Sequence, residues 1–397
     1  MTVHRRRALS ALAAAALLSA CGSPSGGPDA TSSASTTDSA WTVTEAAIRP
    51  AGRVAALIPT AGCALAVGSV STGYGRVAAS WRSADCRTFT SDTPTAPAQE
   101  GDALPRESKI TMTGVATRRD GTFVAVGYEE ERDDAFPQHA RAWRSSDGLR
   151  WKLLPEAFPP SPGGVPHDTP QGVIRLANGT LLAYGSTAGF AVVWHSTDGG
   201  RWSPSRVAPS AGIDDVAQAG TGRLVAVGQR SHSDTYEGRD AAAWTSDDYG
   251  RTWHPGDAAD GSFTRPNEQI LSDVAPLPGR GWIAIGFLRT APDKGTVAVW
   301  QSPDGVAWHL QQHALPAVGP FSAAAGLAVA GQRLVIGGRD GDANAGHAAI
   351  WTSRDGGRMW SADPLNAPPV EAVIAVAGGL VVAIAGDKTA SRALPPA

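Results

Sequence analysis

A short polar turn between two aromatic residues recurs six times along the chain, and it restricts the possible folds more than any other feature. Each copy resembles the segment WHSTDGGRW, Trp194 to Trp202, although the first copy carries Cys86 where most others have glycine. The leading tryptophans are Trp81, Trp143, Trp194, Trp244, Trp300 and Trp351. They are separated by 50 to 62 residues, so a structural unit of about fifty residues is repeated.

Each polar turn is preceded by short apolar segments that are typical of β-strands. Runs such as FVAVGY from Phe123 and LVAVGQ from Leu224 follow a Gly-containing hairpin turn and a further apolar segment. Every unit is therefore predicted to hold four antiparallel strands, A to D, with the polar turn between C and D. Four-stranded units at this period predict an all-β chain that folds as a β-propeller. No sustained helical period follows Ala40, which disfavours a helical solenoid.

The two ends of the chain suggest how the ring closes. A seventh apolar run, LVVAIAG from Leu380, has no tryptophan turn after it, while Trp41 and the following TVTEAAI look like a degenerate turn and a strand D. We expect the N-terminal strand to close the last blade and complete a seven-bladed propeller, since residues 37–397 give about 51 residues per blade. A six-bladed ring with frayed ends is the alternative.

The N-terminus carries an export signal. Three arginines, Arg5 to Arg7, precede an apolar run from Ala8 to Leu18 that is too short to span a bilayer stably. The run ends in Leu18-Ser19-Ala20-Cys21, which resembles the lipobox of bacterial lipoproteins, where the cysteine is acylated and becomes the first mature residue. We predict lipidation at Cys21; a plain secretory signal is the alternative, and the Sec and Tat routes both remain open.

These boundaries predict a signal peptide over 1–20, an acylated flexible tether over 21–36 and a propeller domain over 37–397. The tether is rich in Ser, Thr, Gly and Pro, which have little apolar surface to bury. Removal of the three arginines in 1–20 takes the net charge from −3 to about −6, which argues against a nucleic-acid partner. We expect a monomer held at the extracytoplasmic face of the cell membrane by its lipid anchor.

The pattern Ser-x-Asp-x-Gly-x-x-Trp, as in Ser196 to Trp202, resembles the Asp-box or BNR repeat of sialidases, sortilin-type receptors and several other β-propeller families. The resemblance covers nearly all of the mature chain and implies that the turns lie at the blade periphery, away from the ligand face. The turn chemistry agrees, since Asp198 can accept backbone N–H bonds and Gly199 permits a positive φ. A structural role is assigned to the six box aspartates, Asp85, Asp147, Asp198, Asp248, Asp304 and Asp355.

Two cysteines fit this arrangement. Cys63 falls at the A–B turn of the first unit and Cys86 at its C–D turn, and in a four-stranded meander both turns emerge at the same end. Because exported proteins favour disulfides, we predict a Cys63–Cys86 bridge, with two free thiols as the alternative. A metal site is not expected at these cysteines, since no paired histidines lie nearby.

The ligand face is predicted to consist of the B–C and D–A connections, which vary more than the turns do. The candidate ligand-face residues are Arg49, Arg106, Tyr128, Glu130, His167, Asp168, Tyr236, Arg265, Glu268, Arg289 and Arg339. Asp214 and Asp215 are also assigned to a D–A connection. For any one of these residues, a solvated surface charge is the alternative. The segment DGDAN at 340–344 has alternating oxygen ligands but lacks the later Glu of a calcium loop.

Sialidase chemistry requires three arginines, a tyrosine assisted by a glutamate, and an aspartate, and its first arginine lies in a Phe/Tyr-Arg-Ile-Pro motif. The corresponding stretch, Ala47 to Pro50, reads AIRP, so Arg49 is present but the order is broken. We therefore expect a propeller that binds a protein or glycan ligand without catalysis, with no catalytic residue, cofactor or metal. The alternative is a cell-surface glycoside hydrolase of sialidase-like architecture, because carboxylates on different loops can converge without a local motif.

Overall fold

The computed structural model describes residues 40–72, 75–91, 109–130, 138–160, 167–231, 238–264, 268–291, 294–312, 315–316, 319–342 and 346–394. These residues belong to one compact unit, Asp38–Ala397. The predicted signal peptide, Cys21 and the tether lie outside the described residues.

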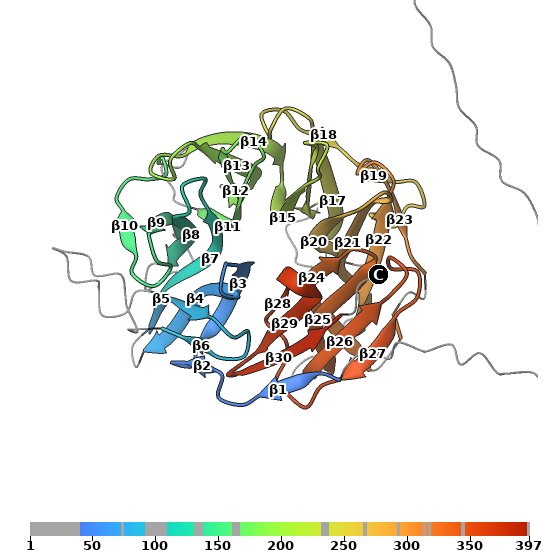
Figure 1. Cartoon of the computed structure of the whole chain (residues 1–397). Helices are drawn as coiled ribbons and strands as arrows, with labels where there is room; N and C mark the ends of the chain where they lie inside the picture. Colours follow the sequence, from blue (N-terminus) through green and yellow to red (C-terminus); the bar gives the residue numbers. More distant parts are fainter. Residues whose placement is uncertain are drawn as a thin grey trace, which may run out of the picture. The chain divides into compact units, whose positions relative to one another are not determined.

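The first strand of each repeat unit lies at the centre of the molecule. These strands are β3 (Arg53–Pro59), β7 (Lys109–Thr117), β11 (Asp168–Arg175), β15 (Ala211–Gln218), β20 (Gln269–Leu277), β24 (Phe321–Ala330) and β28 (Ala372–Val376). Each contacts the next in this order, and β28 contacts β3. The sheets of this unit are therefore arranged around a common centre (Figure 1).

The second and third strands extend each sheet outward by antiparallel pairing. The second strands are β4 (Ala64–Thr72), β8 (Phe123–Glu130), β12 (Leu181–Thr187), β16 (Leu224–Ser231), β21 (Gly281–Ala291), β25 (Arg333–Gly341) and β29 (Leu380–Ala385). The third strands are β5 (Gly75–Ser83), β9 (Gln138–Ser145), β13 (Phe190–Ser196), β17 (Arg239–Ser246), β22 (Lys294–Ser302), β26 (His347–Ser353) and β30 (Lys388–Ala393). The antiparallel four-strand prediction is confirmed, for example in the order β11-β12-β13-β14.

The outer strands are short, except for the seven-residue β14. They are β6 (Phe89–Thr90), β10 (Lys152–Leu154), β14 (Ser203–Pro209), β18 (His254–Pro255), β23 (Ala307–Leu310), β27 (Ser361–Pro364) and β1 (Thr42–Thr44). Two further strands, β2 (Ile48–Arg49) and β19 (Asp257–Ala258), add to β6 and β23 in parallel, and a 3₁₀ helix, η1 (Ala377–Gly379), joins β28 to β29. Such short outer strands offer little free edge for pairing with another chain.

The N-terminal strand pairs with the C-terminal sheet. β1 lies antiparallel to β30, with Thr42 opposite Ser391, and the sheet order is β1-β30-β29-β28. Trp41 precedes β1 as the second aromatic residue of a box precedes β10, β14, β18 and β27, and its Nε1 donates to Asp363 of β27 at 3.2 Å. The two ends of the chain are thus joined in one sheet.

The repeated Val-Gly or Ile-Gly of the second strands has a geometric cause. Most of the inner strands carry a β-bulge, such as the one between Met112 and Gly114, opposite the glycine of the second strand. A Cβ at Gly127 would lie 2.0 Å from the carbonyl oxygen of Thr111, so only glycine fits there. The bulge inserts one extra residue into the inner strand, here Thr113, and Thr113 lines a cavity among the inner strands.

Candidate functional site

A cavity of about 660 Å³ lies among the inner strands β3, β7, β11 and β24 and the segment before β28. The extra residues of the inner-strand bulges, among them Thr113 and Gln171, form part of its wall. The ionisable side chains in the wall are Arg53, Arg76, Tyr128 and Glu371. They come from three repeat units, the first, the second and the last, so the cavity exists only because the inner strands bring these units together.

One of the two arginines in the cavity wall, Arg76, forms an ion pair. Arg76 Nη2 lies 3.2 Å from Glu130 Oε2. Burial raises the pKa of Tyr128, and the Glu130 charge raises it further, while Arg76 and Arg53 oppose both effects. Tyr128 is therefore a neutral phenol that can donate a hydrogen bond, and it is a poor nucleophile.

Glu371 and Arg53 also line this cavity. Glu371 Oε2 accepts a hydrogen bond from Val54 N at 2.9 Å. Burial raises the pKa of Glu371, against the lowering effects of that hydrogen bond and of the Arg53 charge. Arg53 is exposed, and within the described part of the chain no carboxylate lies in ion-pairing distance of it. A guanidinium, a phenol and a carboxyl group are thus available to a polar ligand.

Asp214 is the extra residue of the β15 bulge, on the part of the inner ring beyond β11. Its Oδ2 atom is buried and has no hydrogen-bond partner among the described residues. Burial raises the pKa of Asp214 to about 7, with Asp215 adding to the rise and Arg239 opposing it. Asp214 consequently carries a proton over much of the range below neutral pH.

Asp215 and Asp273 link neighbouring sheets beside Asp214. Tyr184 Oη donates to Asp215 Oδ1 at 2.8 Å, and Asp215 Oδ2 accepts from Val274 N at 3.0 Å. Asp273 Oδ2 accepts from Leu327 N at 2.8 Å. Burial and the neighbouring Asp215 charge raise the pKa of Asp273 well above its usual value, so it stays protonated and donates to Asp215.

The raised pKa of Asp214 predicts a loss of stability as the pH rises from about 4 to about 7. The unfolded chain releases the Asp214 proton near pH 4 and the folded chain near pH 7, so the stability that this proton contributes falls between these two values. We expect the Tm of Asp214→Asn to fall less than that of the native chain between about pH 5 and pH 8. Thermal unfolding across this range checks it, and parallel curves for the two proteins would contradict the assignment.

The box turn at Asp198 is held by its own side chains. Asp198 Oδ1 accepts from Gly200 N at 2.8 Å and from Ser196 Oγ at 3.1 Å, while Ser196 Oγ accepts from Gly199 N at 2.8 Å. Gly199 has φ +74°, and a Cβ there would lie 2.5 Å from Val124 of the preceding unit. The residue choices of the box therefore serve a tight turn that packs against its neighbour.

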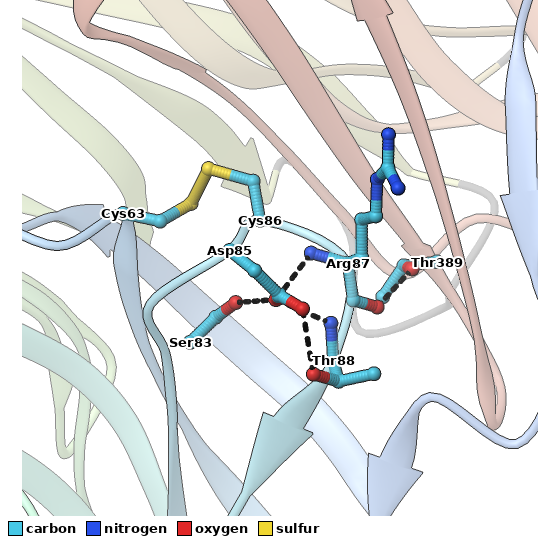
Figure 2. The surroundings of a disulfide bond; sticks show 7 residues. All are labelled: Cys63, Ser83, Asp85, Cys86, Arg87, Thr88 and Thr389. Carbon is cyan, nitrogen blue, oxygen red and sulfur yellow. Dashed lines mark hydrogen bonds between the residues drawn. A yellow bond between two sulfur atoms is a disulfide. The ribbon is translucent and has the colours of Figure 1, made fainter.

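Side chains of one unit also bond the box of the next. Arg82 donates to Asp147 O at 2.8 Å, Arg144 donates to Asp198 O, and Arg280 donates to Asp355 O at 2.7 Å. Thr389 of the C-terminal sheet donates to Arg87 O at 2.5 Å, as Figure 2 shows. The boxes thus fasten adjacent sheets together, which supports the structural role assigned to them.

Acid is expected to weaken the box turns. Burial opposes ionisation of Asp248, but bonds from Thr252, Ser246 and Arg251 outweigh it and lower the pKa to about 2. Its stabilising effect is therefore present above about pH 4, where the unfolded chain is ionised, and is lost between pH 4 and 2. We expect Asp248→Asn to have a shallower loss of Tm in this range, measured by circular dichroism; an unchanged slope would contradict it.

The two cysteines form a disulfide, Cys63–Cys86, with Cα atoms 5.4 Å apart. Figure 2 places it beside the first box, where Asp85 accepts from Ser83 Oγ at 3.1 Å and from Thr88 N at 2.8 Å. Cys86 takes the glycine position of the other boxes with φ +61°. The bridge therefore joins the A–B turn to the box turn of the same sheet.

The structure places only part of the predicted ligand face in the central cavity. Tyr128 lies in its wall, with Glu130 beside it. Glu268 is 2% exposed and pairs with Arg239 at 2.5 Å and Arg289 at 2.8 Å, so it joins two neighbouring units. Arg339 stacks on Phe321 with 4.8 Å to the ring centroid.

The remaining candidates lie elsewhere. Asp168 accepts from Thr187 and lines an outer groove, and His167 forms a bridge with Gln138. Arg49 lies in β2, which pairs with the outer strand β6, and its Nε donates to Ala46 O at 2.9 Å. Three candidates, Arg106, Tyr236 and Arg265, lie outside the described residues.

Sequence reasoning missed Arg53, Arg76 and Glu371, and it misplaced Asp214 and Asp215. Arg53 is the first residue of β3, Arg76 is the second residue of β5, and Glu371 precedes β28. None of these positions belongs to a sequence motif. Asp214 and Asp215 lie within β15 and not in a connection, because the bulge interrupts the alternation that would have marked a strand. A polar residue inside an otherwise apolar inner strand was the available signal.

Within the described ranges, no helix has the length and hydropathy needed to cross a membrane. No group of three or more His, Cys, Asp or Glu side chains in the same ranges is placed to hold a metal ion.

Comparisons with known proteins identify the fold. No protein-family model and no curated protein matches the sequence. A GH74 xyloglucanase from Xanthomonas campestris matches with a TM-score of 0.55 at 18% identity, over 89% of this chain and 54% of that one. A PL25 ulvan lyase matches with a TM-score of 0.50 at 12% identity, over 86% and 93%.

A mutant Trypanosoma rangeli sialidase matches with a TM-score of 0.47 at 13% identity, over 78% of this chain and 53% of that one. The chain thus spans about half the length of the xyloglucanase and the sialidase. The predicted β-propeller fold is confirmed, and at these identities the likeness is one of fold alone.

Proposed function

We propose that the chain is an extracytoplasmic, seven-bladed β-propeller, anchored through acylated Cys21, that binds a protein or glycan ligand without catalysis. The blade count rests on the circle of contacts among the inner strands and on the pairing of β1 with β30. The anchor rests on the lipobox-like segment that ends at Cys21. The ligand is expected to be a component of the cell envelope, because the anchor would hold the propeller there.

The observation that carries the binding function is the cavity lined by Arg53, Arg76 and Tyr128. A volume of about 660 Å³ lies in the range of sites that hold small ligands or the end of a longer one. Its wall combines charged groups with the hydroxyl of Thr113 and the amide of Gln171. Such a mixture suits an oxygen-rich ligand, since each sugar hydroxyl both donates and accepts hydrogen bonds.

Retention experiments test this function. The full chain, immobilised, is exposed to solubilised envelope polysaccharides and envelope proteins, and the retained material is compared between the native chain and Arg53→Ala. The expected result is a loss of retention of about tenfold or more, because a guanidinium that contacts ligand contributes at least 1.4 kcal/mol. Equal retention by the native and Arg53→Ala chains would refute binding in this cavity.

A glycoside hydrolase is the second candidate, and Asp214 favours it. A carboxyl group with a pKa of about 7 on an inner strand is suited to donate a proton to a leaving group. A panel of fluorogenic glycosides tests this function. Turnover by the native chain that is abolished in Asp214→Asn would favour the hydrolase, and absence of turnover by the native chain would favour binding alone.

A further inference from the structure

The position of Ala40 and Trp41 determines which face of the propeller is connected to any preceding anchor. Thr42 begins β1, the outer strand beside β30. In the other sheets the residues just before the outer strand form the box turn, so Ala40 and Trp41 lie at the box end of the C-terminal sheet. Any anchor that precedes Ala40 is therefore connected to the propeller on the face that carries the box turns.

The number of residues between Cys21 and Ala40 restricts which face of the propeller can lie against the membrane. Cys21 and Ala40 are 19 residues apart. A chain of this length spans at most about 65 Å. A folded domain of this size has a radius of gyration of about 20 Å and is thus about 50 Å across. To place the opposite face against the membrane, the tether would have to pass around the domain in a nearly extended form.

The same face carries a basic patch, which we define as Arg119, Arg175, Arg201 and Arg251; Arg119 and Arg175 line one hollow. Arg119 lines a hollow with Thr197, so the A–B and box turns share one face. A neighbouring hollow contains Arg201 and Arg251 with Asp198.

All four arginines of the patch are exposed, and within the described part of the chain no carboxylate forms an ion pair with their guanidinium groups. These four positive charges are thus unpaired, whereas the whole chain has a net charge of −3.

We propose that the basic patch docks on an anionic lipid surface, so that the box face lies against the membrane and the central cavity opens away from it. The proposal rests on the lipid anchor of the proposed function. Each arginine near an anionic bilayer strengthens association by about fivefold, and the tether keeps the patch within reach of the headgroups. The cavity that contains Arg53 would then face material outside the membrane.

Fluorescence quenching on vesicles tests the orientation. Thr197→Cys places a label in a box turn, and Ser71→Cys places one near the end of β4 that lies away from the box turns; both positions are exposed. The acylated full chain is inserted into phosphatidylcholine vesicles with about 30% phosphatidylglycerol and a headgroup-linked quencher. We expect stronger quenching at Thr197 than at Ser71, and loss of most of this difference when the four arginines of the patch are replaced by glutamine.

Each outcome distinguishes the inference from its premise. Equal quenching at both positions on vesicle-bound chain, or a difference that the four substitutions leave unchanged, would overturn the docking surface alone. Recovery of the chain in the supernatant would refute the lipid anchor and the inference with it. High salt should reduce the difference, since the Debye length falls to about 3 Å at 1 M.

Discussion

Replacement of Trp300 by alanine is expected to lower the free energy of unfolding by about 3–5 kcal/mol. Trp300 is fully buried, and its Nε1 donates to Ser262 Oγ at 3.0 Å. The substitution removes a large apolar side chain from the core of its sheet, and it leaves the buried Ser262 hydroxyl without this partner. The leading tryptophan of each box unit is therefore a packing residue.

Urea unfolding, followed by circular dichroism, measures the effect. Met359→Ala is the control, because Met359 belongs to a box turn but is 74% exposed, so its loss should change stability by less than about 0.5 kcal/mol. Trp300→Phe keeps most of the volume and is expected to fall between the two. A cost below about 1 kcal/mol for Trp300→Ala would show that this position does not carry the packing.

Removal of the Cys63–Cys86 bridge is expected to cost about 3 kcal/mol. The bridge spans 23 positions in sequence, and cross-linking a loop of this length restricts the unfolded chain. It also fixes the first box, whose Arg87 carbonyl accepts the bond from Thr389 that links the first unit to the C-terminal sheet. Loss of the bridge should therefore weaken the contact between the first unit and the C-terminal sheet.

The double variant Cys63→Ser, Cys86→Ser tests the bridge, with the urea midpoint measured with and without dithiothreitol. The reductant should lower the midpoint of the native chain to that of the double variant and leave the variant unchanged. A native midpoint that is insensitive to the reductant under unfolding conditions would contradict the expected contribution.

The fold was predictable because each unit repeats its signals. Six boxes in phase, each preceded by runs such as FVAVGY, indicate the same four strands many times over, so one ambiguous copy does not mislead. Even the pairing of β1 with β30 followed from Trp41 and a count of strands.

The site was less predictable, because it arises only when distant strands meet. Arg53, Tyr128 and Glu371 are far apart in sequence and share no motif. Tyr128 is predictable because it lies near the end of β8 on the expected face, whereas Arg53 begins β3 and Glu371 precedes β28, and neither position gives a signal. Asp214 was assigned to a connection because a bulge disrupts the alternation within β15.

We expect the box turns to stabilise the propeller and the cavity that contains Arg53 to bind the ligand. The most direct test compares Asp198→Ala with Arg53→Ala in both thermal unfolding and retention of envelope material. We expect Asp198→Ala to lower the Tm and to leave retention unchanged below its unfolding temperature, and Arg53→Ala to abolish retention with an unchanged Tm. Loss of retention in Asp198→Ala, together with full retention in Arg53→Ala, would contradict the account.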